Sequence, residues 1–476
     1  MFPLVSSCHL NSPEGDTCPL TKLWMFSLIL DLGGHQRLIN DHGFNDDAIA
    51  RYLGLNALLD ERSDETPDRQ SSFRQRAMRL LKQQRQQLKQ QHLTAEYPDP
   101  LKDNLTQLGC LIGLDDLEQR LLGFCALLHT DGLLEDACCL LEEISFNRAL
   151  VILAHLLDAP REAIRQRLAK KGLLVSSGLL DVATYSGRYR RMGDILNADN
   201  SSILSPLRYQ KGTPVELFSN AFRKALPGHL GHDDYRHIKP ALAVARPYLR
   251  HALATRRPGV NILIYGPPGT GKSQLVRFLA KELEVDLYEV ACSDCEGDAI
   301  NRYGRLRALR SAMRVLREQR ALLVLDEIED LFNEGNHTSQ WEEASGQQKN
   351  WFNRVLEENP LPCFWLTNKI HTLDRAYLRR FDVVLELGNP PKAQREQIIR
   401  QNGGDLLSDH LITKLADHQQ ATPAVITRAL TIAKTLVGSR ENPTLETTVE
   451  QLVDATLHAQ GFNKLERSQA QRLPEF

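Results

Sequence analysis

Residues 261–283, NILIYGPPGTGKSQLVRFLAKEL, constrain the fold more than any other stretch of the chain. A short apolar run leads into the glycine-rich segment GPPGTGKS, and an amphipathic helical pattern follows it. Glycine lets backbone N–H groups turn toward an anion, and the following helix directs the positive end of its dipole to the same point. The stretch therefore predicts a phosphate-binding loop in a strand–loop–helix unit. The loop residues are Gly266, Pro267, Pro268, Gly269, Thr270, Gly271, Lys272 and Ser273.

Two side chains of this loop and two acidic residues further on predict a site for a nucleoside triphosphate and its metal. Lys272 is expected to bring its charge to the outer phosphates, and the hydroxyl of Ser273 is expected to bind Mg²⁺. In ALLVLDEIEDLF, Asp326 ends an apolar run and is the predicted acidic partner of that metal, which it would hold through water. Glu327 follows directly and would polarise the attacking water.

The segment CFWLTN, residues 363–368, is a further predicted strand that ends at Asn368. Its amide would hydrogen-bond the attacking water or the γ-phosphate, whereas a lone asparagine at a strand end is commonly a turn residue. The order of the three motifs favours the functional interpretation. We therefore expect ATP and Mg²⁺ as ligands, with Ser273 and Asp326 on the metal.

From about His232 short apolar runs alternate with amphipathic helical segments, which predicts an α/β fold with a parallel sheet covered by helices. After Pro390 helical patterns follow, including one in which Thr422 is the expected N-cap and Pro423 the first helical residue. We expect an N-terminal helical segment (1–65), a basic polar helix and linker (66–100), a mostly helical domain (101–231), the α/β domain (232–390) and a helical lid with a tail (391–476).

Residues 101–231 permit two interpretations. Helical patterns dominate up to Leu174, and LLVSSGLLDV, residues 173–182, is predicted as a hairpin. Two helices joined by a short turn and followed by a hairpin are typical of a winged-helix unit. An ordinary helical bundle explains the same pattern, and we favour the bundle.

The composition limits which partners and which cellular compartment we expect for this protein. A net charge of −2 over 476 residues gives no overall attraction to nucleic acid or membrane. The apolar run LWMFSLIL, residues 23–30, is too short to span a bilayer and lies too far into the chain for a signal peptide. A start of translation at Met25 instead of Met1 is a further hypothesis. Nine cysteines without a regular framework fit a reducing cytoplasm, and the CxxC of Cys292 and Cys295 is a weak zinc signal.

The order of these motifs resembles that of the AAA+ ATPases, and most closely the AAA proteins proper, over about residues 232–460. The matching motifs are the phosphate-binding loop, the Asp-Glu pair, the strand ending in Thr-Asn and the element LRRFD, residues 378–382. The resemblance implies an α/β ATPase domain with a helical lid. It also implies a ring, usually of six subunits, with ATP at each subunit boundary.

The resemblance further implies roles for individual residues. In this family an arginine just before the FD of the last motif reaches the γ-phosphate held by the neighbouring subunit, and Arg380 matches that position. Arg379 is the alternative, because the family commonly separates its two arginines and here they are adjacent. Arg428 lies where AAA+ proteins that have a lid sensor place it, and a surface arginine is the alternative.

Tyr303 and Gly304 resemble the aromatic–glycine pair of the family's pore loop, without the aliphatic residue that usually separates them. A tyrosine packed at a helix start is the alternative. The helix predicted next carries an apolar stripe beside a basic one, and the basic stripe consists of Arg307, Arg310, Arg314 and Arg317. We expect this basic stripe to face solvent or a neighbouring subunit, with an acidic partner or a nucleic-acid backbone as the alternative.

Three functions follow from these observations. The first is a ring-forming ATPase that remodels a protein client recruited by the N-terminal helical region. The second replaces the protein client with nucleic acid, on the strength of the winged helix, the RYRR of residues 188–191 and the arginine stripe. The third is a nucleotide-gated scaffold with slow hydrolysis, against which the presence of Glu327 argues. The sequence contains no HExxH motif, which argues against a fused metalloprotease.

Overall fold

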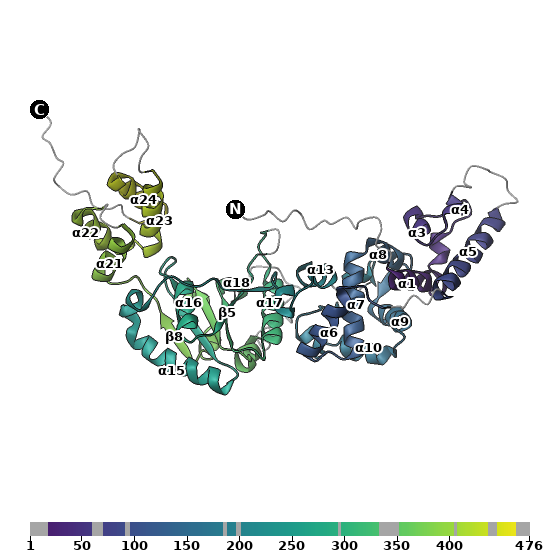
Figure 1. The fold of residues 1–476 in the computed structure, drawn as a ribbon, viewed down its shortest axis with the longest axis horizontal. Helices are drawn as coiled ribbons and strands as arrows, with labels where there is room; N and C mark the ends of the chain where they lie inside the picture. Colours follow the sequence, from purple (N-terminus) through teal and green to yellow (C-terminus); the bar gives the residue numbers. More distant parts are fainter. Residues whose placement is uncertain are drawn as a thin grey trace, which may run out of the picture. The chain divides into compact units, whose positions relative to one another are not determined.

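Short strands form one sheet in the order β3-β5-β6-β7-β4-β8. Figure 1 labels β5 and β8 of this sheet. In this computed structural model β5 pairs with β6, β6 with β7, β7 with β4 and β4 with β8, all in parallel. The strands are β3 (Phe222–Lys224), β4 (Asn261–Tyr265), β5 (Asp286–Val290), β6 (Ala321–Leu325), β7 (Cys363–Thr367) and β8 (Val383–Glu386). Every residue of β6 and β7 is buried, as expected for central strands covered on both faces. The predicted α/β class is confirmed.

The structure describes residues 18–59, 70–90, 96–183, 188–196, 201–293, 297–332, 352–403, 407–436 and 445–462. They divide into two units. Unit 1 comprises the described residues within Met1–Arg223 and Ala291–Arg317, and unit 2 those within Lys224–Val290 and Glu318–Phe476. Most of the segment between β5 and β6, Ala291–Arg317, therefore belongs to unit 1, although both strands belong to unit 2.

Unit 1 is mostly helical, as expected for the N-terminal region. Its helices are α1 (Pro19–Leu30), α2 (His35–Leu38), α3 (Asp47–Tyr52), α4 (Asn56–Leu59), α5 (Gln70–Gln90), α6 (Leu101–Ile112), α7 (Asp116–Thr130), α8 (Gly132–Cys139), α9 (Phe146–Leu156), α10 (Arg161–Arg167), α11 (Leu173–Ser176), α12 (Met192–Leu196), α13 (Ser201–Tyr209), α14 (Pro214–Leu217) and α17 (Arg302–Val315). Two short strands, β1 (Ile144–Ser145) and β2 (Arg188–Tyr189), pair antiparallel.

The hairpin predicted at residues 173–182 is wrong. Residues Leu173–Ser176 form α11, and no strand follows within 177–183. The hydroxyl of Ser177 donates to the carbonyl of Leu173 at 2.6 Å, which closes a helical turn that a strand would not allow. Gly178 then adopts a left-handed backbone with φ +76°. The sequence pattern missed this because leucine and valine suit a buried helix as well as a strand.

The arginine stripe of α17 contacts the N-terminal part of unit 1. Arg307 donates to the carboxylate of Asp181 at 3.2 Å, and Arg310 donates to the carbonyl of Val175 at 3.5 Å. Arg314 donates to the carbonyl of Ile112. A Cβ on Gly178 would lie 2.7 Å from the carbonyl oxygen of Arg307, so the backbones approach closely there. These three arginines therefore bind within unit 1, and the expectation that the stripe faces solvent or another molecule is wrong for them.

Unit 2 surrounds the sheet with helices and ends in a helical region. Its helical elements are η2 (His232–Ile238), α15 (Lys239–Thr255), α16 (Lys272–Glu282), α18 (Glu329–Phe332), a helix at residues 352–358, η3 (Ile370–Thr372), α20 (Arg375–Leu378), α21 (Lys392–Gly403), α22 (Asp409–Asp417), α23 (Pro423–Leu436) and α24 (Leu445–Ala459). The helices α21 to α24 build a hydrophobic core of their own, with Leu415, Leu430 and Val453 fully or almost fully buried. The expected C-terminal helical region is present, and α23 begins at Pro423 as predicted.

The helices of the described ranges include none with both the length and the apolar character needed to cross a bilayer. Within the same ranges no three histidine, cysteine or acidic side chains form a group that could hold a metal ion by themselves. Cys295, one half of the CxxC, lies outside the described residues. The cysteines that the structure describes are free thiols.

A buried polar network fixes the start of β4. Asn261 is fully buried, and its amide group donates to the carbonyls of Leu356 at 2.5 Å and Gly259 at 3.1 Å. Its carbonyl oxygen accepts from the indole N–H of Trp365 at 3.0 Å. One side chain thus joins β4 to β7 and to the helix at residues 352–358, and a buried polar group is costly to leave without a partner.

We predict that Asn261→Leu lowers the free energy of unfolding by about 2–3 kcal/mol, because the Trp365 N–H and the Leu356 carbonyl lose a buried partner. Chemical denaturation of the full chain, followed by circular dichroism, measures the shift. Asn402→Leu is the control, since that half-buried amide bonds only a carbonyl of its own helix. An Asn261→Leu chain as stable as the wild type would contradict the prediction.

Candidate functional site

The glycine-rich loop joins the end of β4 to the start of α16, as the sequence predicts. Gly266, Gly269 and Gly271 have φ of +152°, +81° and +92°, which other residues rarely adopt. A Cβ on Gly266 would lie 2.1 Å from the carbonyl oxygen of Leu387. Thr270 is buried, and its hydroxyl donates to the carbonyl of Pro267 at 3.0 Å. The loop is therefore held in a conformation that glycine alone permits.

Lys272 turns back into the loop. Its ammonium donates to the carbonyls of Gly266 and Pro267, both at 2.9 Å, and to the side-chain oxygen of Asn368 at 2.7 Å. Burial lowers the pKa of Lys272 from its ordinary value, and the carboxylates of Asp326 and Glu329 oppose that shift. The cation is therefore surrounded by oxygen atoms, which phosphate oxygens can replace.

Ser273 and Asp326 lie in direct contact. The hydroxyl of Ser273, in the first turn of α16, donates to the Asp326 carboxylate at 2.6 Å. Asp326 follows the last residue of β6. A hydroxyl and a carboxylate side by side are oxygen donors of the kind that Mg²⁺ prefers. The residues present thus fit the predicted metal.

Glu327 occupies a strained position beside this pair. Its φ of +51° puts a non-glycine residue in the left-handed region, and its side chain is exposed. Its backbone N–H donates to the Asp326 carboxylate at 2.9 Å, and the N–H of Ile328 donates to the carbonyl of Leu366 in β7 at 3.1 Å. Strain of this kind is concentrated at functional sites, which supports the predicted role.

The strand order brings the separate motifs together. Because β7 lies between β4 and β6, the residue after β7 stands between the loop after β4 and the acidic pair after β6. Asn368 is that residue, and it is half-buried. Parallel strands end at the same edge of a sheet, where α/β proteins bind their ligands.

The three arginines predicted to act on the nucleotide, Arg380, Arg379 and Arg428, are not among the residues in these contacts. Arg380 forms an ion pair with Glu357 on the helix at residues 352–358, and about a third of its side chain, 34%, is exposed. Arg379 caps the C-terminal end of α20 and is exposed. Arg428 is exposed on α23. The structure therefore joins Lys272 to Asn368 and Ser273 to Asp326 by direct contacts, and the three arginines take no part in those contacts.

Tyr303 and Gly304 lie in the first turn of α17 in unit 1. Tyr303 is 56% exposed. Asn301 caps the helix by accepting from the N–H of Gly304 at 2.8 Å. The predicted pore role of this pair stays a prediction.

Three residues near the loop were missed by the sequence reasoning. Tyr235, in η2, donates its hydroxyl to the carbonyl of Gly271 at 3.2 Å. The backbone N–H of Ala424, at the start of α23, donates to the carbonyl of Gly269 at 3.3 Å. Glu329 accepts from the backbone N–H of Asn368 at 2.6 Å. All three contacts join segments far apart in the chain, and the only local signal was the extra acidic residue in DEIED.

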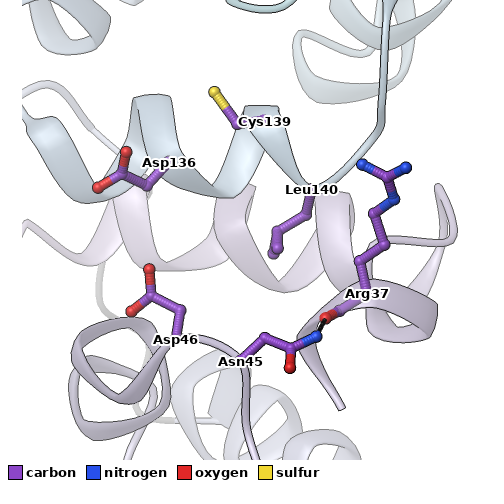
Figure 2. Close-up of a pocket in the computed structure, with 6 residues that line it drawn as sticks. All are labelled: Arg37, Asn45, Asp46, Asp136, Cys139 and Leu140. Atoms are coloured by element: carbon purple, nitrogen blue, oxygen red, sulfur yellow. Dashed lines mark hydrogen bonds between the residues drawn. The ribbon is translucent and has the colours of Figure 1, made fainter. Parts of the chain in front are cut away.

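A pocket in unit 1 is separate from this site. Figure 2 shows its lining of Arg37, Asn45, Asp46, Asp136, Cys139 and Leu140. Asp46 caps α3 by accepting from the N–H of Ile49 at 2.9 Å, and Arg37 pairs with Glu142 at 2.7 Å. Burial and the nearby Asp46 carboxylate raise the pKa of Asp136. Two of its polar groups thus serve local contacts, and we assign the pocket no role.

We predict that Lys272→Ala weakens ATP binding at least tenfold, because the loop loses its only side-chain cation for the outer phosphates. Titration with a fluorescent ATP analogue measures the affinity. Lys281→Ala, on the same helix, should leave affinity unchanged. Equal affinity of the Lys272→Ala and wild-type proteins would rule out this loop as the phosphate site.

Known proteins share this part of the chain. Residues 262–389 match the family model described as "ATPase family associated with various cellular activities (AAA)". The ATP-dependent zinc metalloprotease FtsH of Lachnoclostridium phytofermentans is 29% identical over 170 residues, which cover 34% of this chain and 29% of the relative. The 26S proteasome regulatory subunit 8 homolog B of Arabidopsis thaliana is 28% identical over 168 residues, which cover 33% of this chain and 39% of the relative.

Among solved structures, the crystal structure of the FIGL-1 AAA domain in complex with ADP aligns with a TM-score of 0.37 and 17% identity, covering 51% of this chain and 92% of that one. The chain spans well under half the length of the two curated relatives. The residues matched by the family model include the glycine-rich loop, Asp326, Glu327, Asn368 and Arg380. Residues 262–389 therefore carry an AAA+ ATPase core.

Proposed function

We propose that this protein hydrolyses ATP within a homo-oligomeric ring, of six subunits as is usual in the family it resembles, and uses that hydrolysis to remodel a protein client. One observation carries the proposal. Lys272 contacts Asn368, Ser273 contacts Asp326, and Glu327 stands exposed beside them, so that a phosphate loop, a metal pair and a carboxylate meet at one sheet edge.

The chain's own residues suggest the sequence of events. The backbone N–H groups of the loop and the dipole of α16 would receive the phosphates. Lys272 would exchange the Asn368 oxygen for phosphate oxygens, which releases the amide of Asn368 toward the γ-phosphate and the attacking water. Glu327 would accept a proton from that water. Ser273 and Asp326 would hold Mg²⁺, which when bound neutralises charge on the β- and γ-phosphates.

A ring would complete each site with an arginine from the neighbouring subunit. We assign that role to Arg380, with Arg379 as the alternative. The ion pair of Arg380 with Glu357 is partly exposed, and pairs of this kind contribute at most about 1 kcal/mol. An arginine held so weakly can leave its carboxylate for a γ-phosphate. Its guanidinium stays charged and offers several donors, which suits phosphate.

A protein client is favoured over nucleic acid. Arg307, Arg310 and Arg314, which had suggested a nucleic-acid surface, contact groups of unit 1 instead. Arg191 of the RYRR segment pairs with the buried Glu135 at 3.3 Å. The two curated relatives described above carry names that tie them to protein degradation, a metalloprotease and a proteasome regulatory subunit.

The N-terminal helical region would recruit the client, and the scattered cysteine thiols support a cytoplasmic location. The five segments expected from the sequence, the sensor role of Arg428 and the pore role of Tyr303 and Gly304 belong to the same proposal. A slowly hydrolysing scaffold is the second candidate from a different class.

We predict that Glu327→Gln lowers the ATP turnover rate by about 10²–10⁴-fold while ATP affinity stays within about threefold, because the amide cannot take the proton. Affinity capture of this variant with ATP, followed by mass spectrometry, should enrich protein clients. Glu358→Gln, an exposed carboxylate of the same unit, is the control.

Other outcomes would each point elsewhere. If the Glu327→Gln variant hydrolyses ATP at the wild-type rate, Glu327 has no catalytic role. Stimulation of wild-type turnover by DNA or RNA, with no client enriched, would favour the nucleic-acid alternative. Negligible wild-type turnover with ATP-dependent assembly would favour the scaffold.

We predict that Arg380→Ala lowers turnover by about 10³–10⁵-fold, as expected for loss of an arginine that acts across a subunit boundary. A mixing experiment tests the boundary itself. Glu327→Gln subunits keep Arg380, and Arg380→Ala subunits keep Glu327, so mixed rings contain some intact composite sites. ATPase activity should therefore return when the two inactive proteins are mixed.

Arg375→Ala, an exposed arginine of α20, should keep full activity and serves as the control. A mixture that stays inactive although light scattering shows mixed rings would mean that Arg380 acts within its own subunit. If the Arg380→Ala variant is active, Arg380 is not the required arginine, and the same experiment is then done with Arg379→Ala.

A further inference from the structure

Glu329 is a buried carboxylate to which the proposed mechanism gives no role. It opens α18, three residues after Asp326, and only 8% of it is exposed. One oxygen accepts from the backbone N–H of Asn368 at 2.6 Å. The other oxygen, Oε2, is buried and has no hydrogen-bond partner among the described residues. A buried carboxylate with one oxygen left unpaired is costly, so its presence calls for a reason.

The position of the bond supplies that reason. Within β7 the backbone groups bond to the neighbouring strands, but β6 ends at Leu325, and its register with β7 ends at Leu325 opposite Trp365. The N–H of Asn368 lies beyond that last pair and has no strand to bond on that side. Glu329 replaces the missing ladder partner. It thereby fixes the backbone of Asn368 at the point where the side-chain amide meets Lys272.

The turn that leads to Glu329 also carries two residues of the proposed mechanism. Asp326 and Glu327 precede Glu329 in the chain, and the N–H of Ile328 is bonded to Leu366 of β7 at 3.1 Å. Two bonds therefore tie this turn to the end of β7, one from Ile328 and one from Glu329. The bond to Glu329 joins this turn directly to the backbone of Asn368.

We propose that Glu329 is a positioning residue that fixes Asn368 and couples it to the turn carrying Glu327. The proposal rests on the proposed ATPase function for its kinetic consequences, but the hydrogen bond itself does not depend on ATP. Glu329 acts through the backbone of Asn368 and touches no substrate in this role. A glutamine at this position keeps an acceptor oxygen, whereas an alanine keeps none.

We predict that Glu329→Ala lowers kcat for ATP hydrolysis about 10- to 100-fold with KM changed less than about threefold, because the bound ATP meets a misplaced amide. Glu329→Gln should stay within about threefold of the wild type. Asp330→Ala is the matched control, since this neighbouring carboxylate is exposed on the same helix. Melting temperatures of all variants identify any that fail to fold.

A double-variant cycle tests whether Glu329 acts through Asn368. The variant with Glu329→Ala and Asn368→Ala should be no slower than Asn368→Ala alone, because the side chain being positioned is already gone. Losses of kcat that multiply would overturn the proposal. An unchanged kcat in Glu329→Ala, or a Glu329→Gln variant as slow as Glu329→Ala, would also overturn it.

A measurement without ATP separates this proposal from the proposed function. Hydrogen–deuterium exchange at the backbone N–H of Asn368 should be slow in the wild type and in Glu329→Gln. It should be at least tenfold faster in Glu329→Ala. If the wild type hydrolyses no ATP, the proposed function fails while this exchange pattern still supports the positioning bond. Equal exchange in all three folded proteins would show that the bond does not hold Asn368.

Discussion

The placement of β7 between β4 and β6 is the constraint on which the site depends. Parallel pairing sets the end of β7 level with the end of β4, opposite Tyr265, and carries β7 past the end of β6 at Leu325. A residue directly after β7 can then reach both adjoining loops. The hydrogen bond between Lys272 and Asn368 is the direct result. A sheet with β4 beside β6 would bring the phosphate loop to the acidic pair and leave Asn368 outside.

The backbone of the glycine-rich loop is fixed by several contacts. The loop glycines adopt positive φ, and at Gly266 the carbonyl of Leu387 also leaves no room for a side chain. The start of α23 bonds the carbonyl of Gly269, and Tyr235 bonds that of Gly271, so separate parts of unit 2 hold the same loop. Such support is what a preorganised phosphate site needs, because backbone donors are useful only when their directions are fixed.

The sequence was informative where the chemistry is local. The glycine-rich loop, Asp326, Glu327 and the ends of the strands are each carried by a few adjacent residues, and the structure puts Lys272, Ser273, Asp326 and Asn368 at one edge of the sheet. The hairpin at residues 173–182 failed because a leucine-rich run fits two kinds of element. Glu329 and Tyr235 could not be found from the sequence, since their roles arise from hydrogen bonds to residues more than 30 positions away.

The arginines of α17 show how strongly sequence context can mislead. A row of positive charges along a helix predicts a surface, yet Arg310 and Arg314 donate to backbone carbonyls contributed by the first 180 residues. A shortened protein that began near residue 224 would still carry α17, but without those carbonyls. Its guanidinium groups would lose these acceptors, and their positive charge would then attract polyanions as a by-product of truncation. Whether such a fragment retains nucleic acid during purification therefore says nothing about the natural client of the whole chain.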